Sequence, residues 1–468
     1  MTNSEIGALI MAAGKGTRMK SDLPKVLHNI IDEPILSYIL RALLKTEVRS
    51  TAVIVGHKGE MIEDYLKSSW SDVDILWQRE QLGTGHAVQV SREWWSNFNH
   101  ILVLNGDLPM LTSETIQSLI DKHIDSSSDC TLLSFITENP GSYGRVIRSD
   151  NSQKVSIVEY KDATPEERRI NEVNAGVYMF RVSKLLKVID NLSNDNAQGE
   201  YYLPDVVALM GKYEGEDMKT FAFTADKEEL EGVNSLSEFA ELTGKIIKRI
   251  NAHWMERGVR MVDPLTVVIS PRAELEENVN LAPSVHILGE SYIGKGSRIG
   301  AWSSLSNVKT GQNVALISNV IAENSSFHDG AKAGPFTYIR EGTEICEGAF
   351  AGKFVEIKKS CIGKNSKVPH LSYIGDTKIG ENTNIGAGTI TCNYDGFKKS
   401  QTVIGDRAFI GSDTMLVAPV TVGNDATTGS GSTITKNVPD GALAVSRAKQ
   451  VNIEDWTHKK RIKCGEQK

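Results

Sequence analysis

Residues 374–388 read IGDTKIGENTNIGAG, and their pattern, an aliphatic residue followed by glycine, returns mostly every six positions as far as Thr435. Residues six apart fall on nearly opposite faces of a helix. They take equivalent places in a parallel β-helix, where each side of a coil holds one hexapeptide and stacked coils bury the aliphatic residue. The pattern starts less regularly near Val285, and about ten coils of three hexapeptides fit between Thr266 and Asn437. Because the spacing holds over so many units, we predict a solenoid rather than scattered strands and turns.

The composition is that of an ordinary globular protein with more than one domain. The chain has 468 residues, 40% hydrophobic and 24% charged, and is too long for a single core. Its net charge of −7 disfavours nucleic acid and anionic membranes as partners, and neither a signal peptide nor a membrane-spanning run is recognisable. The five scattered cysteines form no C-x-x-C pair. We expect them to be reduced thiols of a cytoplasmic protein, and neither a disulfide set nor a zinc site.

The first half alternates short apolar runs with helical patterns, which predicts a nucleotide-binding, Rossmann-like α/β domain with a mostly parallel sheet. The expected strands are Ile6–Met11, Thr51–Val55, Asp74–Trp77, Ile101–Leu104 and Thr131–Phe135, and Leu36–Leu44 is an expected helix. Ligands of such sheets bind at the carboxyl ends of the strands. Two polar turns lie at such ends, one from Gly14 to Arg18 and one from Asn105 to Asp107.

The first of these turns could hold phosphate. Gly14 and Gly16 let the backbone approach a ligand, and N–H groups there can bind phosphate oxygens. The loop is not a P-loop and lacks the third glycine of a dinucleotide fingerprint, so a plain glycine turn remains an alternative on these residues alone. Arg18 and Lys25 follow, where two cations could flank a polyphosphate. Asp107, in the second turn, could ligate Mg²⁺ or cap the turn.

A helix is predicted between the two halves. Ser235 with Glu238 three residues on forms a capping-box pattern, and Gly258 is a stop signal. Apolar residues recur between them at helical steps: Leu236, Phe239, Ala240, Ile246, Ile247, Ile250 and Trp254. We expect a first domain at residues 1–236, a linker helix at 237–260, and a β-helix domain with a C-terminal tail at 261–468. The sequence leaves open whether the helix is a rigid spacer that holds the two domains' sites apart or packs on the first domain.

Several segments of the first half resemble the sugar-nucleotide pyrophosphorylases. They are Leu9-Ile-Met-Ala-Ala-Gly-Lys-Gly-Thr-Arg-Met19 with Asp22-Leu-Pro-Lys25, Gln81–His86, Asn105–Pro109, Tyr143–Arg145, Ile157–Lys161, Asn174–Gly176, Asn196–Tyr202 and Gly232–Asn234. In this order, and joined to a hexapeptide solenoid, they make nearly the whole chain similar to one family. It is the bifunctional N-acetylglucosamine-1-phosphate uridyltransferase/glucosamine-1-phosphate acetyltransferase family of bacterial cell-wall precursor synthesis. Met11 stands where this family usually has leucine, a substitution of similar volume.

The resemblance implies uridylyl transfer from UTP to N-acetylglucosamine-1-phosphate in the first domain, by in-line attack of the sugar phosphate on the α-phosphorus. The Gly14 loop and Arg18 would hold the triphosphate, and Lys25 would neutralise its charge. Asp107 and Asn234 would ligate Mg²⁺, with Asn234 also touching the substrate. The uridine site would be lined by Gln78, Gln81, Gly83 and Thr84, and the sugar would be held by Gly144, Glu159 and Asn174.

The solenoid departs from its repeat in two places, and such departures are candidate sites. One is Phe354–Lys359 with His370–Tyr373, and the other is Asn384 with the inserted loop from Thr391 and its lysines. Both are similar to the acetyltransferase segments of the same family, which implies acetyl transfer from acetyl-CoA to the amine of glucosamine-1-phosphate. The residues implied to bind glucosamine-1-phosphate are Arg340, Lys358, Tyr373 and Asn384. Those implied to contact acetyl-CoA are Ala387, Asn393, Tyr394, Lys399, Ser412, Ser430 and Arg447. Ser430 lies in Thr428–Gly431, where the family more often has Ile-Ala-Ala-Gly.

Two residues, His370 and Cys392, are candidates for the first step of acetyl transfer. The resemblance makes His370 the general base for attack by the sugar amine, a role that suits an imidazole, although a lone histidine in a strand is more often structural. Cys392 could instead take the acetyl group first. We favour direct attack because Cys392 has no neighbouring histidine in the sequence to lower its pKa. Nearby lysines leave the thiol route open.

The resemblance also implies a left-handed β-helix, against the usual crossover preference, and a homotrimer with acetyl-transfer sites between neighbouring chains. Two other classes of protein share parts of the pattern. One is a nucleotidyltransferase of single activity whose solenoid serves only assembly, and the other is a regulatory subunit with an inactive nucleotidyltransferase domain, as in a eukaryotic translation exchange factor. The presence of His370 argues against the first, and the presence of Lys25 and Asp107 argues against the second.

Overall fold

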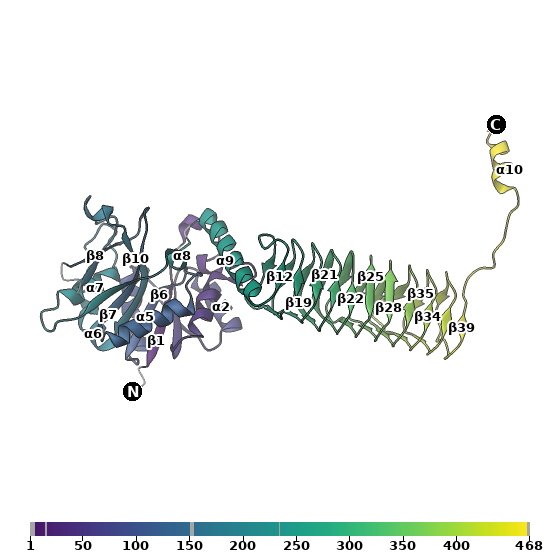
Figure 1. Ribbon diagram of the computed structural model, residues 1–468, viewed down its shortest axis with the longest axis horizontal. Coiled ribbons are helices and arrows are strands. Elements are labelled where there is room, and N and C mark those ends of the chain that lie inside the picture. The colour runs from purple at the N-terminus through teal and green to yellow at the C-terminus, as the bar shows by residue number, and fades with distance from the viewer. Residues whose placement is uncertain (1–4, 15, 150–153, 234, 466–468) are drawn as a thin grey trace. The chain divides into compact units, whose positions relative to one another are not determined.

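The computed structural model describes residues 5–14, 16–149, 154–233 and 235–465 (Figure 1). The chain divides into two compact units, Met1–Ile246 and Ile247–Lys468, which we call unit 1 and unit 2. Unit 1 has an α/β fold, and unit 2 is a stack of β-coils with a C-terminal tail (Figure 1). None of the helices in the described ranges is long and apolar enough to cross a membrane.

Unit 1 is built on a nine-stranded sheet with the order β11-β7-β10-β6-β1-β4-β5, to which β8 and β9 are added beside β10. The strands are β1 Ile6–Ala12, β4 Ser50–Val55, β5 Asp74–Trp77, β6 His100–Asn105, β7 Cys130–Ile136, β8 Arg145–Arg148, β9 Val155–Val158, β10 Glu172–Arg181 and β11 Thr220–Thr224. All five predicted strands are present. Strand β1 pairs in parallel with β4 and β6, whereas β10 is antiparallel to both β6 and β7. The sheet is therefore mixed, and the prediction of a mostly parallel sheet missed β10.

Helices cover both faces of this sheet. They are α1 Ile35–Leu43, α2 Gly59–Ser69, α3 Thr84–Val90, α4 Arg92–Trp95, α5 Ser113–Asp125, α6 Val182–Val188, α7 Pro204–Gly211 and α8 Lys227–Leu230; the short hairpin β2 Asn29–Ile30 and β3 Glu33–Pro34 precedes α1. Side chains of a strand alternate between faces. Ile6 and Ile10 of β1 accordingly lie in the core with α1, α2 and α5, and Leu9 lies in the core with α3, α6 and α7. Burial on both faces explains why β1 is apolar throughout.

Helix α9, Leu236–Glu256, runs from unit 1 into unit 2. The predicted cap is present, because the Glu238 backbone N–H donates to Ser235 Oγ at 3.2 Å. Gly258 follows the helix with a positive φ of 88°, as expected of a glycine stop. Within unit 1 the ring of Phe239 lies edge-on to His28, so the first part of the helix is packed.

Unit 2 is a parallel β-helix in which each coil contributes strands to two sheets. The eleven-stranded sheet contains β12 Arg260–Met261, β15 Asn280–Leu281, β18 Arg298–Ile299, β20 Ala315–Leu316, β22 Lys332–Ala333, β25 Phe350–Lys353, β28 Lys367–His370, β31 Asn384–Ile385, β34 Phe409–Ile410, β37 Thr427–Thr428 and β39 Leu443–Ala444. The other sheet contains β13 Val268–Ile269, β14 Glu274–Leu275, β16 His286–Leu288, β17 Tyr292–Ile293, β19 Ser304–Thr310, β21 Val320–Phe327, β23 Thr337–Ile339, β24 Glu344–Ile345, β26 Glu356–Lys358, β27 Cys361–Ile362, β29 Tyr373–Gly375, β30 Thr377–Ile379, β32 Ile390–Cys392, β33 Thr402–Ile404, β35 Met415–Val417, β36 Val420–Val422 and β38 Thr433–Ile434. Helix α10, Trp456–Lys463, lies in the tail. The predicted solenoid is confirmed.

Three columns of stacked strands matter for the sites. Column A is β25, β28, β31, β34 and β37; column B is β23, β26, β29, β32 and β35; column C is β24, β27, β30, β33 and β36. The chain passes from B to C to A in each coil. Ile339, Ile357 and Ile374 stand opposite one another in column B and are 0% exposed. This aliphatic ladder is the physical cause of the six-residue repeat.

The corners between columns need left-handed backbone, which asparagine and aspartate tolerate better than other residues with side chains. Residues of these two types with positive φ include Asn307, Asn313, Asn319, Asn324, Asn365, Asp376, Asn382, Asp413 and Asp425. The polar half of each hexapeptide thus makes the turn, while its aliphatic residue fills the core.

Candidate active sites

Unit 1 contains a cavity of about 550 Å³ at the carboxyl ends of its central strands. Among the residues that line it are eight predicted for UTP or the metal: Gly14, Arg18, Lys25, Gln78, Gln81, Gly83, Thr84 and Asp107. Asn105 and Glu200 line it as well. No role was predicted for these two from the sequence, although both lie in segments that carried the resemblance. Residues from five separate parts of the sequence therefore meet in one cavity.

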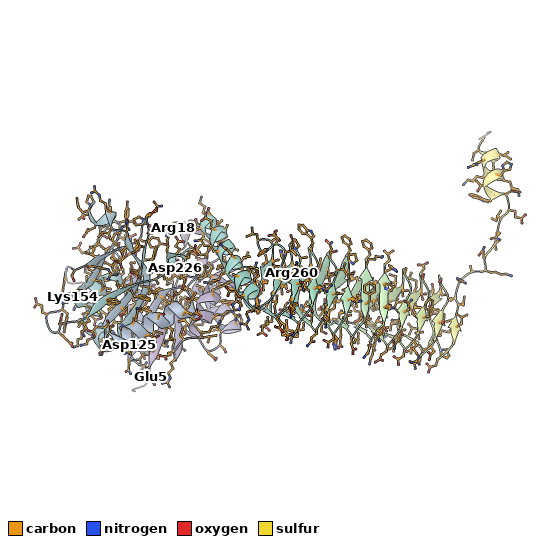
Figure 2. The ribbon with its side chains drawn as sticks, viewed as in Figure 1. Glu5, Arg18, Asp125, Lys154, Asp226 and Arg260 are labelled. Carbon is orange, nitrogen blue, oxygen red and sulfur yellow. The ribbon has the colours of Figure 1, made fainter. Side chains whose placement is uncertain are left out.

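Backbone geometry shapes the mouth of this cavity. Gly16 has a φ of 55° and precedes the 3₁₀ turn Thr17–Met19, which presents the exposed Arg18 (Figure 2). Gly83 has a φ of 113°, and a Cβ atom there would lie 2.5 Å from the carbonyl oxygen of Tyr201. Only glycine fits both the conformation and the space.

A hydrogen-bond network fixes the predicted uridine residues. The Gln78 side chain, 3% exposed, donates from Nε2 to the Gly83 carbonyl at 3.0 Å. Gln81 Nε2 donates to the Gln78 carbonyl at 2.9 Å, and Thr84 Oγ1 accepts from the backbone N–H of Leu203 at 3.0 Å. The loop is thus held in shape by the residues that were predicted to line it, which is the preorganisation that a nucleotide site needs.

Lys25 and Asp107 form an ion pair with each other. Their side chains are 19% and 17% exposed, and Lys25 Nζ also donates to the Val233 carbonyl at 2.8 Å. The resemblance gave the two residues separate ligands, so this pair was not foreseen. Asn234, the other predicted metal ligand, lies outside the described residues. The preceding Val233 donates its backbone N–H to the Asp107 carbonyl at 3.4 Å, so this part of the chain runs past Asp107.

Gly144, Glu159 and Asn174 form a second cluster in unit 1. The backbone N–H of Asn174 donates to the Gly144 carbonyl at 2.9 Å, and a Cβ at Gly144 would lie 3.1 Å from Glu159 Oε1. Burial raises the pKa of the Glu159 carboxyl, and the nearby carboxylates of Asp205 and Asp162 raise it further. Arg145, 1% exposed, donates to the carbonyls of Tyr143 and Gly141. It therefore holds the loop that carries Gly144.

In unit 2, four predicted residues stack in a row at the corner where the chain leaves column A for column B. Strand β28 pairs with β31 so that Lys367 is opposite Asn384. Continuing the same register for three more residues places His370 beside Ala387. Ile385, Ile410 and Thr428 are successive partners, which sets Ala387, Ser412 and Ser430 side by side. Asp413 N–H donates to the Ala387 carbonyl at 2.7 Å, and Gly431 N–H to the Ser412 carbonyl at 2.9 Å.

Two basic residues adjoin this corner row. Arg447 Nη1 donates to the Ser430 carbonyl at 2.7 Å, so the start of the tail is tied to the row. Lys353 pairs with His370 in the register of β25 and β28. Lys353 was not singled out from the sequence, because only the register shows that a residue one coil earlier is the neighbour of His370.

Arg340, Lys358 and Tyr373 lie on column B, on successive coils. Arg340 N–H donates to the Ile357 carbonyl at 2.8 Å, which sets Arg340 beside Lys358, and Tyr373 is opposite Glu356. Both predicted phosphate-binding cations are in ion pairs. Arg340 Nη1 lies 2.8 Å from Glu356 Oε1, and Lys358 Nζ lies 3.1 Å from Glu341 Oε1.

Asn384 is separated from these three residues within one chain. It begins β31 of column A, whereas the other predicted glucosamine-1-phosphate residues belong to column B. The structure therefore does not bring the whole predicted set onto one face.

The inserted loop after β32 is tightly hydrogen-bonded. Asn393, 7% exposed, donates from Nδ2 to Asp376 Oδ2 at 2.5 Å. Tyr394 and Lys399 form a β-bridge, with Tyr394 Oη donating to the Gly396 carbonyl at 2.6 Å. Burial raises the pKa of the Cys392 thiol just before this loop. A thiol with a raised pKa is a poor nucleophile near neutrality.

Two family models match this chain, one in each unit. A nucleotidyl transferase model matches residues 7–227, and a model of bacterial transferase hexapeptides (six repeats) matches residues 401–436. The bifunctional protein GlmU of Carboxydothermus hydrogenoformans is 43% identical over 448 residues, which are 96% of this chain and 99% of that protein. GlmU of Heliobacterium modesticaldum is 44% identical over 454 residues, 97% of this chain and 98% of its own. A solved UDP-glucose pyrophosphorylase complexed with UDP-glucose covers 54% of this chain and 100% of its own, with a TM-score of 0.43 and 17% identity.

Proposed function

Because this chain belongs to the GlmU family of bifunctional proteins, we propose that its two units carry the two reactions of a bifunctional acetyltransferase and uridyltransferase. Unit 2 transfers the acetyl group of acetyl-CoA to the amine of glucosamine-1-phosphate. Unit 1 transfers a uridylyl group from UTP to N-acetylglucosamine-1-phosphate, which produces UDP-N-acetylglucosamine and pyrophosphate. One observation supports the assignment: eight residues expected for UTP or Mg²⁺ line one cavity of unit 1, and four expected for acetyl transfer form the corner row of unit 2, although both sets are scattered in sequence.

In unit 1 the protein positions two phosphorylated substrates for an in-line displacement. UTP occupies the 550 Å³ cavity, with its base beside Gln78 and Gly83 and its phosphates toward Arg18 and Lys25. The sugar phosphate is held at Gly144, Glu159 and Asn174 and attacks the α-phosphorus. Positioning and charge neutralisation suffice for such a step, which is consistent with the nucleophile belonging to the substrate.

Mg²⁺ fits this site by the chemistry of its donors. The Asp107 carboxylate lines the cavity and already has the Lys25 ammonium as its counter-ion, so the position attracts a cation. Asp107 would hold the ion together with Asn234, and bound Mg²⁺ would neutralise phosphate charge. Lys25 would then be released to a phosphate oxygen.

In unit 2 His370 takes the proton from the amine as the amine attacks the thioester carbon of acetyl-CoA. The carbon–sulfur bond then breaks, and coenzyme A leaves as a thiolate that accepts this proton. Its place in the corner row puts it next to Ala387, with Ser412 and Ser430 continuing the row along which acetyl-CoA lies. Asn393, Tyr394, Lys399 and Arg447 complete the contacts with acetyl-CoA. Arg340 and Lys358 receive the phosphate of glucosamine-1-phosphate, which exchanges their ion pairs with Glu356 and Glu341 for contacts with the ligand.

We also propose a homotrimer, because a second chain would complete the acetyl-transfer site. Asn384 and the column B residues lie on different faces of one chain, so a ligand touching all of them needs two chains. Exposed apolar side chains line the same corner: Trp302, Phe336, Phe354 and Leu371 are 69%, 54%, 58% and 63% exposed. Contiguous apolar surface of this kind is typical of interfaces. The five free cysteines fit a reducing cytoplasm.

A pair of assays on the full chain tests the assignment. Asp107→Ala is expected to lose pyrophosphate release from UTP by orders of magnitude and to keep acetyl-CoA-dependent thiol release. His370→Ala is expected to show the reverse, with acetyl-CoA binding retained. Each variant is the control for the other. Loss of both activities in either variant with native thermal unfolding, or retention of both, would contradict the division between units.

A further inference from the structure

Four side chains of types that can ligate metals lie together at column C of unit 2, away from the corner row. Glu344 is opposite Cys361 on the next coil. Cys346 follows Glu344 by two residues and its N–H donates to the Ile362 carbonyl at 3.0 Å, so it is the diagonal neighbour of Cys361 on the same side of the coil. His328 Nε2, from the preceding coil, lies 2.7 Å from Glu344 Oε1.

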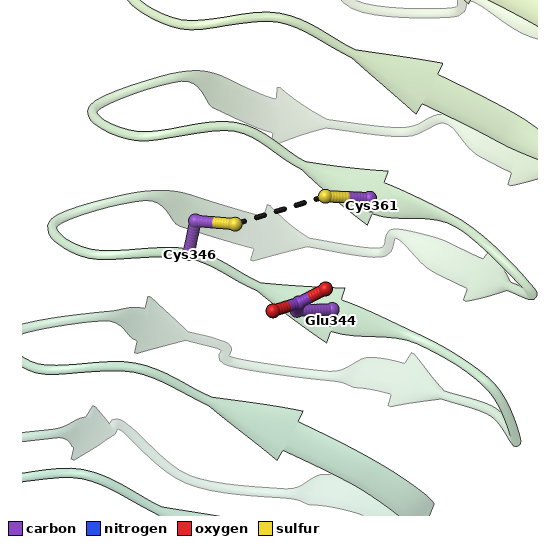
Figure 3. A group of neighbouring side chains, drawn as sticks. All are labelled: Glu344, Cys346 and Cys361. Atoms are coloured by element: carbon purple, nitrogen blue, oxygen red, sulfur yellow. Dashed lines mark hydrogen bonds between the residues drawn. The ribbon is translucent and has the colours of Figure 1, made fainter.

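The ligand atoms of three of these residues converge. One carboxylate oxygen of Glu344 and the sulfur atoms of Cys346 and Cys361 all lie within 4.8 Å of one another. Figure 3 shows the two sulfur atoms directed at each other across successive coils, with the Glu344 carboxylate beside them. All three residues are partly exposed, so an ion can reach the group from solvent.

The separation of the sulfur atoms matches a metal chelate. With zinc–sulfur bonds of about 2.3 Å and a tetrahedral angle, two thiolates of one zinc site lie about 3.75 Å apart. Cys346 Sγ and Cys361 Sγ are 3.7 Å apart. A disulfide would need them about 1.65 Å closer and would leave Glu344 without a role.

We propose that Cys346, Cys361 and Glu344 form a binding site for a thiophilic divalent cation of the Zn²⁺ class, with water as the fourth ligand. Two thiolates and one carboxylate are a donor set suited to zinc. His328 is a positioning residue, because its hydrogen bond to Glu344 Oε1 orients the ligating carboxylate, as partners of metal ligands commonly do. No zinc site was expected from the sequence, because the cysteines form no C-x-x-C pair. Coil stacking replaces that local spacing here.

Cobalt substitution of the full chain tests the site. The parent for this experiment carries Cys464→Ser, which removes an exposed tail thiol. The protein is freed of metal with a chelator, kept reduced with a non-coordinating phosphine, and titrated with Co²⁺. We expect one cobalt ion per chain with a near-ultraviolet sulfur-to-cobalt charge-transfer band and the visible bands of a tetrahedral site, which Zn²⁺ then removes by displacement. An oxygen-ligated cation at Asp107 gives no such charge-transfer band.

The variants separate this site from adventitious binding. Cys346→Ser and Cys361→Ser are each expected to lose the charge-transfer band while thermal unfolding stays close to that of the parent. Cys392→Ser is the matched control, since it removes another partly buried thiol of the β-helix and should leave the band unchanged. His328→Ala should weaken cobalt binding by about 10–100-fold. No band in the parent, or a band that persists in the Cys346→Ser/Cys361→Ser double variant, would overturn the proposal.

Discussion

Gly83 offers a sharp test of how the unit 1 cavity is built. Its φ of 113° is open to glycine and not to alanine. A Cβ there would lie 2.5 Å from the carbonyl oxygen and 2.8 Å from the nitrogen of Tyr201, both backbone atoms. Those two atoms bond to the backbone of Gly85 and Leu82 at 2.7 and 2.8 Å. Gly83→Ala must therefore displace either the segment around Gly83 or the segment around Tyr201, which are hydrogen-bonded to each other beside the predicted uridine site.

The size of the effect follows from these contacts. Strained backbone costs about 1–3 kcal/mol, and each of the two displaced hydrogen bonds contributes about 1 kcal/mol. Strain and lost hydrogen bonds together destabilise the native loop at Gly83 by about 3–5 kcal/mol, so the variant favours an opened loop. Since about 1.4 kcal/mol is tenfold in an equilibrium constant, we expect kcat/KM for UTP to fall by about a hundredfold or more.

The assay is pyrophosphate release at varied UTP, with acetyl transfer by the same preparation as an internal measure of folded protein. Gly199→Ala is the matched control, because Gly199 also has a positive φ, of 66°, but a Cβ atom added to it would meet no other atom within 4 Å. It should lose at most about 5- to 30-fold, since only left-handed backbone strain of about 1–2 kcal/mol applies. A Gly83→Ala protein with the parent's UTP kinetics and thermal unfolding would refute the reasoning. Equal losses in the two variants would do so too.

Three further predictions concern separate parts of the chain. A fragment ending at Ile246, where the compact unit ends, should retain uridylyl transfer, and a folded but inactive fragment would show that unit 1 is not sufficient. Cys392→Ala should retain acetyl turnover, because burial raises the pKa of this thiol; an acetylated enzyme trapped by mass spectrometry, together with an inactive variant, would favour the thiol route. Burial and the neighbouring His100 lower the pKa of His123 to about 3. Between pH 6.5 and about 3 the unfolded chain therefore binds more protons at this residue than the folded chain does, so the free energy of unfolding falls as the pH drops through that window. Denaturant unfolding at several pH values should show a shallower acid loss for His123→Gln, and an unchanged slope would exclude this histidine as a cause.

The central strands of unit 1 could be predicted from the sequence because burial on both faces makes them continuous apolar runs, and the partly buried edge strand β5 still carries enough apolar residues to be recognised. Asp74–Trp77 matches β5 in both bounds, and Ile6–Met11 falls one residue short of β1. Strand β10 was missed, and with it the mixed character of the sheet. Its insertion between β6 and β7 depends on pairing over long sequence separations, which no local pattern records.

The contacts of the charged and thiol residues in unit 2 required the register of the coils. In a β-helix, residues about one coil apart are neighbours, so a partner is found by coil length and not by local spacing. Arg340 pairs with Glu356, 16 residues on, and the thiols of Cys346 and Cys361 meet at a separation of 15. The spacing of Cys346 and Cys361 does not fit a C-x-x-C motif, so the sequence gives no sign that their thiols meet. In the same way, Arg340 looks unpaired in the sequence although Glu356 is its partner on the next coil. The same repeat that makes this fold predictable from its aliphatic residues thus hides the pairing of its polar ones, because an inserted loop or a shortened coil shifts every later partner. The partner of a polar residue in a solenoid is therefore set by the length of the coil that separates the two residues. Here the coil length brings together Cys346 and Cys361, which have no partner nearby in the sequence, and makes them a candidate metal site.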